Sequence, residues 1–208
     1  MCGLGGRSSV AEIDSRPGAA ATTLVLITGA PGSGKTTLAG HLAPALGFPL
    51  LAKDDLKETL MDALGAPTRA ESQCLGGAAY ALLFHLLDEL VGRVPGIIVE
   101  SNFARGRAEA DLAPFVTRGG GGAMVHCEAA RDAIVARIEA RAESAQRHPG
   151  HFDHEALPSV LARLDDGAFG PLELPLPLLR VETTTEYRPQ FSEVMRFVRG
   201  NGRRIGRR

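Results

Sequence analysis

Short apolar runs alternate with longer amphipathic segments along this chain from residue 23 onward. Five of the runs have the length and apolar composition of buried strands, at 23–28, 49–52, 96–100, 123–127 and 178–182. The intervening segments carry apolar residues at helical spacing and predict helices at 37–46, 54–64, 69–91, 107–116, 129–147 and 190–198. Strands that alternate with helices are typical of a mostly parallel sheet with helices on both faces. We therefore expect an α/β fold built on a five-stranded sheet.

Three details of this pattern are specific enough to check. The four glycines at 119–122 predict a turn, and the Pro- and Leu-rich stretch 171–177 predicts irregular chain. The helix 69–91 should turn one apolar side to the core, formed by Leu75, Ala79, Leu82, Leu83, Leu86 and Leu90.

Length and composition describe an ordinary globular chain. Its 208 residues suffice for one domain with a sizeable core, which we place at 23–199. The net charge of −1 gives no overall field that favours nucleic acid or a membrane, and no apolar stretch is long enough to span one. Residues 1–22 are expected to form a flexible leader without the apolar core of a signal peptide. Residues 200–208 form an Arg-rich tail.

Cysteine usage bears on the compartment. Cys2, Cys74 and Cys127 are odd in number, far apart in the sequence and without the spacing of a metal site. Such usage suits a reducing environment, so we expect a cytoplasmic protein.

The strongest chemical signal lies directly after the first predicted strand. Backbone N–H groups of a glycine-rich loop can cradle phosphate oxygens, the loop lysine can reach the β- and γ-phosphates, and the following hydroxyl can ligate Mg²⁺. The next helix adds its positive N-terminal end, and with it Thr37. A strand before and a helix after the loop favour a nucleotide site for ATP and Mg²⁺ over a glycine-rich turn. The pattern G-x-x-x-x-G-K-[ST] is met by Gly29, Ala30, Pro31, Gly32, Ser33, Gly34, Lys35 and Thr36.

A second signal stands where the second strand meets a helix, in the run Lys53-Asp54-Asp55-Leu56-Lys57-Glu58. That carboxyl edge of an open α/β sheet is where ligands bind. Asp54 or Asp55 could accept the proton of a hydroxyl that attacks a γ-phosphate. The alternative is that one of them caps the helix. We expect a cap from one and a catalytic role for at least one.

A third signal, Glu100-Ser101-Asn102, ends the third strand. Glu100 is placed like the carboxylate that holds the magnesium shell in phosphate-loop enzymes. It could instead contact a substrate hydroxyl, or simply be a polar residue at a strand end.

A fourth signal is a set of arginines on or after the polar helix 129–147. Arg137 and Arg141 are four residues apart and share a helix face, and Arg147 follows. A guanidinium can neutralise charge that spreads over a transferring phosphoryl group. A solvated face balanced by Glu139 and Glu143 is the alternative. Beside a phosphate-binding loop we favour a mobile lid at about 130–155, with Arg137 and Arg141 acting in catalysis and Arg147 on the nucleotide.

Two further clusters are weaker. His148, His151 and His154 could suggest zinc, but they lack a matching ligand cluster and a Pro-Gly turn interrupts them, so we favour a lid hinge or a substrate contact. The Arg-rich tail could follow a nucleic-acid backbone, but it lacks the interleaved aromatic residues of a stacking surface. We expect it to be a solubilising end.

Taken together, these motifs resemble the small P-loop kinases over about residues 23–199. The nearest group contains kinases similar to the kinase domain of polynucleotide kinase, chloramphenicol phosphotransferase and zeta toxin. Polynucleotide kinases have an Arg-Asp-Asp-Tyr-Arg-like run after the second strand, whose first Asp is the base, and Lys53–Lys57 matches it. The resemblance therefore implies that Asp54 is the base. The family's Asp-Thr-Asn matches Glu100-Ser101-Asn102, with Glu in place of Asp.

The resemblance also implies arginines on a lid helix after the fourth strand. It places adenine between this lid and the loop after the last strand, where this chain has residues 183–185 and Tyr187. It does not fix the acceptor, because the same scaffold phosphorylates nucleic-acid ends, antibiotics, sugars and nucleotide sugars. The neutral charge and the lack of a phosphatase or ligase partner domain disfavour nucleic acid.

The sequence therefore predicts an ATP- and Mg²⁺-dependent kinase that acts on a hydroxyl of a small molecule, with Asp54 as base. Lys35 and the loop amides would hold the phosphates, and Thr36 with Glu100 the metal. Two alternatives stay open. One is a polynucleotide 5′-hydroxyl kinase, and the other is a regulatory or ATPase module without an acceptor.

Overall fold

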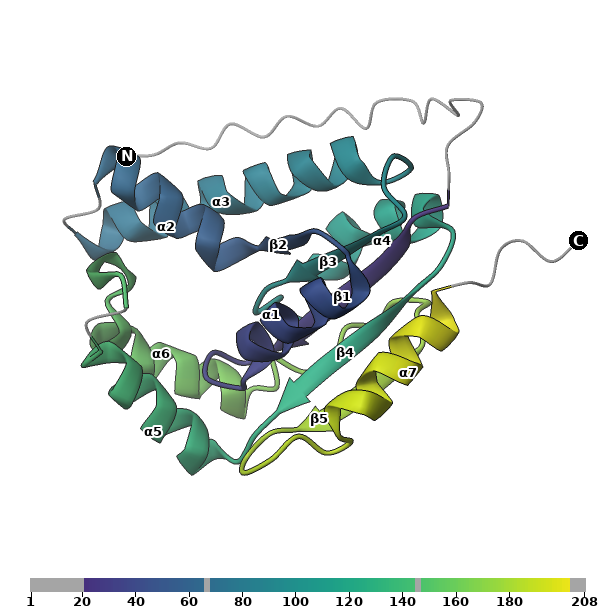
Figure 1. Ribbon diagram of the computed structural model, residues 1–208. Helices are drawn as coiled ribbons and strands as arrows, with labels where there is room; N and C mark the ends of the chain where they lie inside the picture. The colour runs from purple at the N-terminus through teal and green to yellow at the C-terminus, as the bar shows by residue number, and fades with distance from the viewer. Residues whose placement is uncertain (1–20, 66–67, 145–146, 203–208) are drawn as a thin grey trace, which may run out of the picture.

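A computed structural model describes residues 21–65, 68–144 and 147–202 (Figure 1). The predicted alternation of strands and helices is confirmed, with most boundaries within three residues of the expected ones. In chain order the elements are β1 (Thr23–Gly29), α1 (Lys35–Leu46), β2 (Leu50–Ala52), α2 (Lys53–Leu64), α3 (Arg69–Leu90), β3 (Gly96–Glu100), α4 (Ala108–Gly119), β4 (Gly122–Glu128), α5 (Arg131–Ala142), the 3₁₀ helix η1 (Pro149–His151), α6 (Asp153–Asp165), β5 (Leu178–Glu182) and α7 (Phe191–Asn201).

The five strands form one sheet in the order β2-β3-β1-β4-β5, and every pair is parallel. Parallel neighbours need crossover connections, which the helices supply. All seven residues of β1 are buried, because this strand is central in the sheet and is covered on both faces. All carboxyl ends of the strands therefore meet at one edge, which is the edge where ligands bind in such sheets.

Alternate residues of the strands build two separate cores. Leu24 and Leu26 of β1 point to the face that α3 and α4 cover, while Val25 and Ile27 point to the face that α1 and α7 cover. This alternation follows from the two-residue period of a strand. The central strand is thus fixed from both sides, and so is the loop that leaves its carboxyl end.

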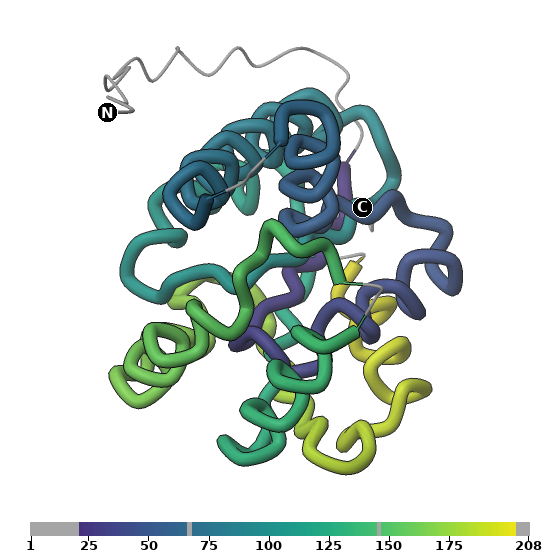
Figure 2. The backbone as a smooth tube through the Cα atoms, turned by 90° about the vertical axis from the view of Figure 1, so that its left-hand side faces the viewer, coloured from purple at the N-terminus to yellow at the C-terminus, as the bar shows by residue number. Residues whose placement is uncertain are grey.

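A third, smaller cluster attaches the predicted lid. Ile134 and Ile138 of α5 pack with Ala30 of the phosphate-binding loop and with Phe169. Leu157, Val160 and Leu164 of α6 pack against this cluster. In Figure 2 the chain between α5 and α6 lies between α2–α3 and α5. The lid therefore contacts the loop through apolar side chains as well as polar ones.

Several sequence predictions need correction. The polar helix ends at Ala142, not near residue 147, and the sequence pattern missed α6. The glycines at 119–122 do not form a turn by themselves, because α4 runs to Gly119 and β4 begins at Gly122. The predicted apolar side of α3 is rotated: Ala79, Leu83 and Leu87 are buried, whereas Leu82 is 39% exposed. The stretch 171–177 is irregular, as expected.

The ends of the chain are described only in part. Of the predicted leader, residues 1–20 lie outside the described residues, while Thr22 is buried and its hydroxyl donates to the carbonyl of Val94. Of the predicted Arg-rich tail, 203–208 lie outside them, and α7 continues through Asn201. Within the part of the chain that the structure covers, no helix is long and apolar enough to cross a membrane.

Acid is expected to destabilise the fold through His126, a buried histidine of β4. Its Nδ1 lies 2.8 Å from the hydroxyl of Thr28 on β1, and its Nε2 lies 3.6 Å from a carboxylate oxygen of Glu128. Burial lowers the pKa of His126 to about 4; Glu128 opposes this shift and Arg180 of β5 adds to it. The unfolded chain therefore takes up a proton between about pH 6.5 and 4 that the folded chain does not.

Because the unfolded state binds more protons in that range, the free energy of unfolding should fall as the pH is lowered through it. The loss from this one group is about 2 kcal/mol at pH 4.5. Urea unfolding between pH 7.5 and 4.5 measures it, and His126→Gln is the matched control, whose profile should be flatter by that amount. Equal slopes for the two proteins would contradict the assignment.

Candidate active site

Strand register brings the predicted site residues together at the carboxyl edge of the sheet. Glu100, the last residue of β3, is level with Ile27 of β1 on one side and with Ala52 of β2 on the other. The phosphate-binding loop begins two residues after Ile27, and Asp54 follows two residues after Ala52. Three segments that are far apart in the sequence thus meet at one place.

The loop has the shape that a phosphate cradle requires. Gly29 has φ +141°, and a Cβ there would lie 2.3 Å from the carbonyl oxygen of Cys127, so no larger residue fits. Gly34 precedes α1 in a left-handed conformation, and no side chain caps that helix. The first amides of α1, those of Lys35 and Thr36, are therefore left for an anion. These features fit the phosphate chain of a nucleoside triphosphate.

Lys35, Thr36 and Glu100 form one polar cluster, in which Lys35 and Glu100 are buried and Thr36 is exposed. The Thr36 hydroxyl donates to Glu100 Oε2 at 3.2 Å, and Lys35 Nζ lies 3.8 Å from Glu100 Oε1 and 3.3 Å from the carbonyl oxygen of Ala30. Glu100 is 2% exposed. Burial raises the pKa of Glu100, and the Lys35 ammonium opposes the shift. The structure thus places together the two residues that the sequence predicted for the metal.

The donor set at this cluster fits magnesium. Mg²⁺ keeps several waters and uses one or two protein oxygens together with phosphate oxygens, so it needs no protein cage. Thr36 and Glu100 supply a hydroxyl and a carboxylate beside the loop. In the described ranges, no group of three His, Cys, Asp or Glu side chains could hold a metal by itself, the histidines of the lid included.

Asp54 lies in the first turn of α2, where its carboxylate is 39% exposed. The expectation that Asp54 or Asp55 caps this helix is wrong, because the N-cap is Ala52 and no side chain caps it. Burial alone would raise the pKa of Asp54, but the positive charges of Lys53, Lys35 and Arg147 contribute to lowering it well below its ordinary value. Asp54 is therefore an ionised carboxylate that accepts from Lys53 Nζ at 3.2 Å and is still partly open to solvent.

The structure separates the two lid arginines that share a face in the sequence. Arg137 points to the loop: its guanidinium donates to the carbonyl of Gly32 at 3.0 Å and to the carbonyls of Thr183 and Thr184. Arg141 points away from the loop, to the carboxylate of Asp153 on α6. Arg137 therefore holds α5 to the phosphate-binding loop, while Arg141 holds α5 to α6.

Arg137→Met is expected to lower the free energy of unfolding by about 1–3 kcal/mol, because buried carbonyl groups lose a charged donor. Nucleotide affinity should fall with it, because the Gly32 carbonyl belongs to the loop. Urea unfolding and nucleotide titration measure the two effects. Arg131→Met is the matched control: its ion pair with Asp165 is exposed and should contribute less than about 1 kcal/mol. Equal effects of both variants would contradict the role of Arg137.

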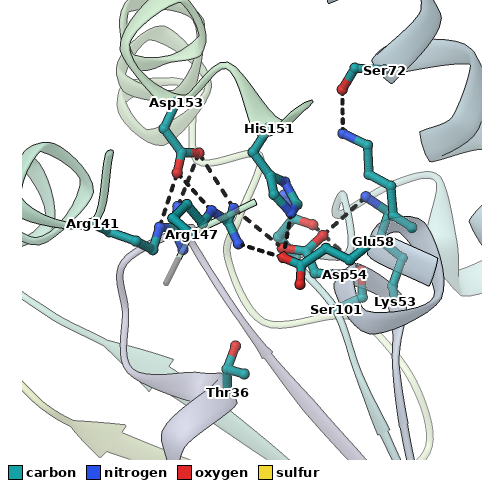
Figure 3. A network of polar contacts seen from close by, with 12 residues as sticks. Thr36, Lys53, Asp54, Glu58, Ser72, Ser101, Arg141, Arg147, His151 and Asp153 are labelled. Carbon is teal, nitrogen blue, oxygen red and sulfur yellow. Dashed lines mark hydrogen bonds and ion pairs between the residues drawn. The ribbon is translucent and has the colours of Figure 1, made fainter. Parts of the chain in front are cut away.

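Arg147 stands at the centre of a polar network that joins the lid to α2 (Figure 3). Its guanidinium donates to Asp153 Oδ2 at 2.8 Å and to Glu58 Oε1 at 3.2 Å, and it lies 3.9 Å from Asp54 Oδ2. His151 Nε2 lies 2.6 Å from the same Glu58 oxygen. Two lid residues therefore meet Glu58, one helical turn after Asp54.

The protonation states of this network are set by burial. Burial, reinforced by the charge of Arg147, lowers the pKa of His151 to about 3, so His151 is neutral and donates from Nε2. Burial raises the pKa of Asp153, but its hydrogen bonds from Arg147 and the charge of Arg141 outweigh this and lower it. Arg147 thus shares its charge among three acids, Asp54, Glu58 and Asp153.

Sequence reasoning missed Glu58 and Asp153 as members of the site. For Glu58 a signal existed, since it lies four residues after Asp54 on the same helix face. For Asp153 there was none, because its contacts depend on how α6 folds back on α5. Tyr80 was missed as well: its hydroxyl lies 2.8 Å from Ser101 Oγ, and Lys53 Nζ lies 5.5 Å from its ring centre.

Comparison with known proteins agrees with this geometry. A family model described as an AAA domain matches residues 24–166, which is well over half of the chain. The chain belongs to this family. The matched range contains the phosphate-binding loop, Asp54, Glu100 and the lid, so the family likeness covers the whole candidate site. No curated protein matches this AAA-domain chain.

Solved structures share the fold. A candidate kinase from Chloroflexus aurantiacus j-10-fl is 33% identical, with a TM-score of 0.77 over 87% of this chain and 98% of the other. A sugar kinase from Janibacter sp. HTCC2649 is 17% identical, with a TM-score of 0.52 over 85% and 91%. A chain of the Pnkp1/Rnl/Hen1 RNA repair complex is 17% identical, with a TM-score of 0.51 over 71% of this chain and 47% of the other. This AAA-domain protein thus has a kinase-like P-loop fold, as the sequence predicted.

Proposed function

We propose that the protein is an ATP- and Mg²⁺-dependent kinase that transfers the γ-phosphoryl group to a hydroxyl of a small molecule. One observation carries the proposal: the partly exposed carboxylate of Asp54 stands among cations at the same sheet edge as the phosphate-binding loop. A module that only bound ATP would not need an ionised carboxylate there. The 33% identity to a candidate kinase supports the same class.

Asp54 would act on the acceptor hydroxyl. With its pKa lowered by the surrounding cations, Asp54 is a weak base, and its first role is to accept a hydrogen bond and orient the hydroxyl oxygen toward the γ-phosphorus. In a loose transition state the hydroxyl becomes acidic only as the new P–O bond forms, so the carboxylate can take the proton late. The negative charge of a bound triphosphate would also raise the pKa of Asp54.

The opposite side of the site would hold the donor. The loop amides and Lys35 would bind the β- and γ-phosphates, and Thr36 would supply a metal ligand, with Glu100 directly or through water. Magnesium, when bound there, neutralises charge on the phosphate oxygens. Lys35 Nζ lies between Glu100 and the phosphate-binding loop. Lys35 could therefore contact a bound phosphate while it keeps its ion pair with Glu100.

The lid would close over the transferring group. Arg137 holds α5 to the loop, and Arg147 lies on the Asp54 side, where its guanidinium can neutralise charge on the γ-phosphoryl oxygens. Closure would also exclude water and so limit hydrolysis of ATP.

A transfer assay tests the proposal. The full chain is incubated with γ-labelled ATP, Mg²⁺ and a panel of hydroxyl compounds that includes 5′-hydroxyl oligonucleotides, and label in the acceptor is measured. Label in a small molecule supports the proposal. Label in oligonucleotides alone would replace it by a polynucleotide 5′-kinase, and release of free phosphate without any labelled acceptor would replace it by an ATPase.

A further inference from the structure

The chain contains only three lysines, Lys35, Lys53 and Lys57, beside twenty arginines. All three lie at the candidate site, although arginine supplies the positive charge everywhere else along the chain. Lysine presents a compact point charge, whereas arginine presents a broad planar fork. Lys35 belongs to the phosphate-binding loop, which leaves Lys53 and Lys57 on α2 to be explained.

Lys57 is a buried cation that has no carboxylate partner among the described residues. It is 8% exposed, and its Nζ donates to the hydroxyl of Ser72 on α3 at 2.7 Å. In the described part of the chain, no Asp or Glu oxygen lies within ion-pair distance of it, whereas Lys35 has Glu100 and Lys53 has Asp54. A buried charge that is not paired is costly, and an anionic ligand would remove that cost.

Lys53, one helical turn before Lys57 on α2, also lies next to Gly76 of α3. A Cβ added to Gly76 of α3 would lie 3.9 Å from Lys53 Nζ and 3.9 Å from Lys57 Cε. A Cβ at Gly76 would thus be in ordinary van der Waals contact with both lysines, so the side-chain position of residue 76 adjoins both of them and is unfilled. The Ser72 hydroxyl accepts from Lys57, so its own proton remains to donate. The spot has two cations and a hydroxyl donor, which together suit an oxyanion.

We propose that the acceptor carries an anionic group, a phosphate or a carboxylate, which binds between Lys53 and Lys57 beside Gly76 while the reacting hydroxyl lies against Asp54. This inference rests on the proposed kinase function. Asp54 and Lys57 are three residues apart on one helix, so their side chains are neighbours on its surface. The acceptor is therefore a small hydroxy compound whose anion is separated from the reacting hydroxyl by a few bonds.

The electrostatics agree with this placement. The pKa of Lys57 is lowered to about 8, first by burial and then by the charges of Lys53 and Arg147, which Asp54 and Asp153 only partly offset. The local potential around Lys57 is thus positive in the absence of a ligand. An anion held there would stabilise the charged form of the lysine.

Anion binding can be measured separately from catalysis. The protein is first saturated with a non-hydrolysable ATP analogue and Mg²⁺, which fill the phosphate-binding loop. Inorganic phosphate and acetate are then titrated separately by calorimetry. We expect binding of at least one anion, weakened at least tenfold by Lys57→Met and changed less than twofold by Arg93→Met, a distant exposed control. Binding of phosphate alone indicates a phosphorylated acceptor, and binding of acetate alone indicates a carboxylate.

A second pair of variants keeps both lysines. Gly76→Asp would place a carboxylate beside Lys53 and Lys57 and should abolish anion binding, whereas Gly76→Asn, of the same size and neutral, adds the bulk without the charge and should weaken binding by a smaller factor. If Lys57→Met does not fold, these two variants still test whether the anion binds beside the lysines. The inference is overturned if neither anion binds to the parent protein, or if Lys57→Met or Gly76→Asp binds as the parent does.

Phosphoryl transfer gives an independent result. Glycerol, glycerol 3-phosphate and glycerate are compared as acceptors with γ-labelled ATP. One outcome is that glycerol, the neutral alcohol, is phosphorylated and that Gly76→Asp does not change the rate. That outcome would overturn the anion site but would leave the kinase proposal standing. The other outcome is that anion binding is lost in Lys57→Met, while no compound in either assay is phosphorylated. That outcome would support the anion site and count against the kinase.

Discussion

Asp54→Asn is expected to reduce phosphoryl transfer by about 10²–10⁴-fold while leaving nucleotide affinity within about threefold of the parent. The amide keeps the size of the carboxylate but cannot take the proton of the acceptor, and it donates where the carboxylate accepts. Nucleotide affinity should persist because Asp54 belongs to α2 and not to the phosphate-binding loop. Single-turnover transfer from γ-labelled ATP and titration with a fluorescent ATP analogue measure the two quantities.

Asp55→Asn is the matched control for this prediction. Asp55 is the next residue of the same turn, is exposed and has a pKa that burial and the charge of Asp54 raise. Its loss should leave transfer near the parental rate. If Asp55→Asn reduces transfer as strongly as Asp54→Asn does, or if Asp54→Asn transfers at the parental rate, the base is not Asp54.

Lys35→Met is expected to weaken nucleotide binding by about a hundredfold, which is about 2.7 kcal/mol, and to reduce transfer by at least as much. Lys35 is the cation of the loop, and its loss removes charge that the β- and γ-phosphates need both in the bound state and in the transition state. Isothermal titration with an ATP analogue and the single-turnover assay measure these effects. Unchanged binding and transfer would reject the loop as the nucleotide site.

A stability effect must be separated from the binding effect in this variant. Lys35 is the cation nearest to Glu100, which is buried, so Lys35→Met leaves that carboxylate without its partner. Glu100→Gln in the same chain removes the unpaired charge. The double variant should regain thermal stability but not nucleotide affinity. Recovery of both would show that Lys35 acts through Glu100 and not on the phosphates.

The parts of the site that the sequence predicted are those with local rules. The loop pattern, the strand before it and the helix after it are contiguous, so their geometry follows from a dozen neighbouring residues. The position of Asp54 and Glu100 at strand ends could be predicted as well, because parallel strands share a carboxyl edge. Their roles remain predictions for the experiments above.

The lid shows where local rules fail. Arg137 and Arg141 share a helix face in the sequence, yet one contacts the phosphate-binding loop and the other contacts Asp153 on α6. The helix α6 was missed although Leu157, Val160 and Leu164 stand at helical spacing, and in the structure these three side chains pack against the apolar cluster of α5. The contact of His151 with Glu58 joins residues 93 positions apart, which no short-range pattern predicts.

The sequence by itself determined the fold class, the phosphate-binding loop and the carboxylates at the strand ends, because these depend on periodicity and on short motifs. Only the tertiary structure decided which groups are paired with which. Within the part of the chain that the structure describes, it gave Lys57 no carboxylate at ion-pair distance, placed the partly exposed Asp54 among cations and bound Arg147 to Glu58 and Asp153. The physical reason is that burial and ion pairing act over a few ångströms in space, and that distance is set by strand register and helix packing.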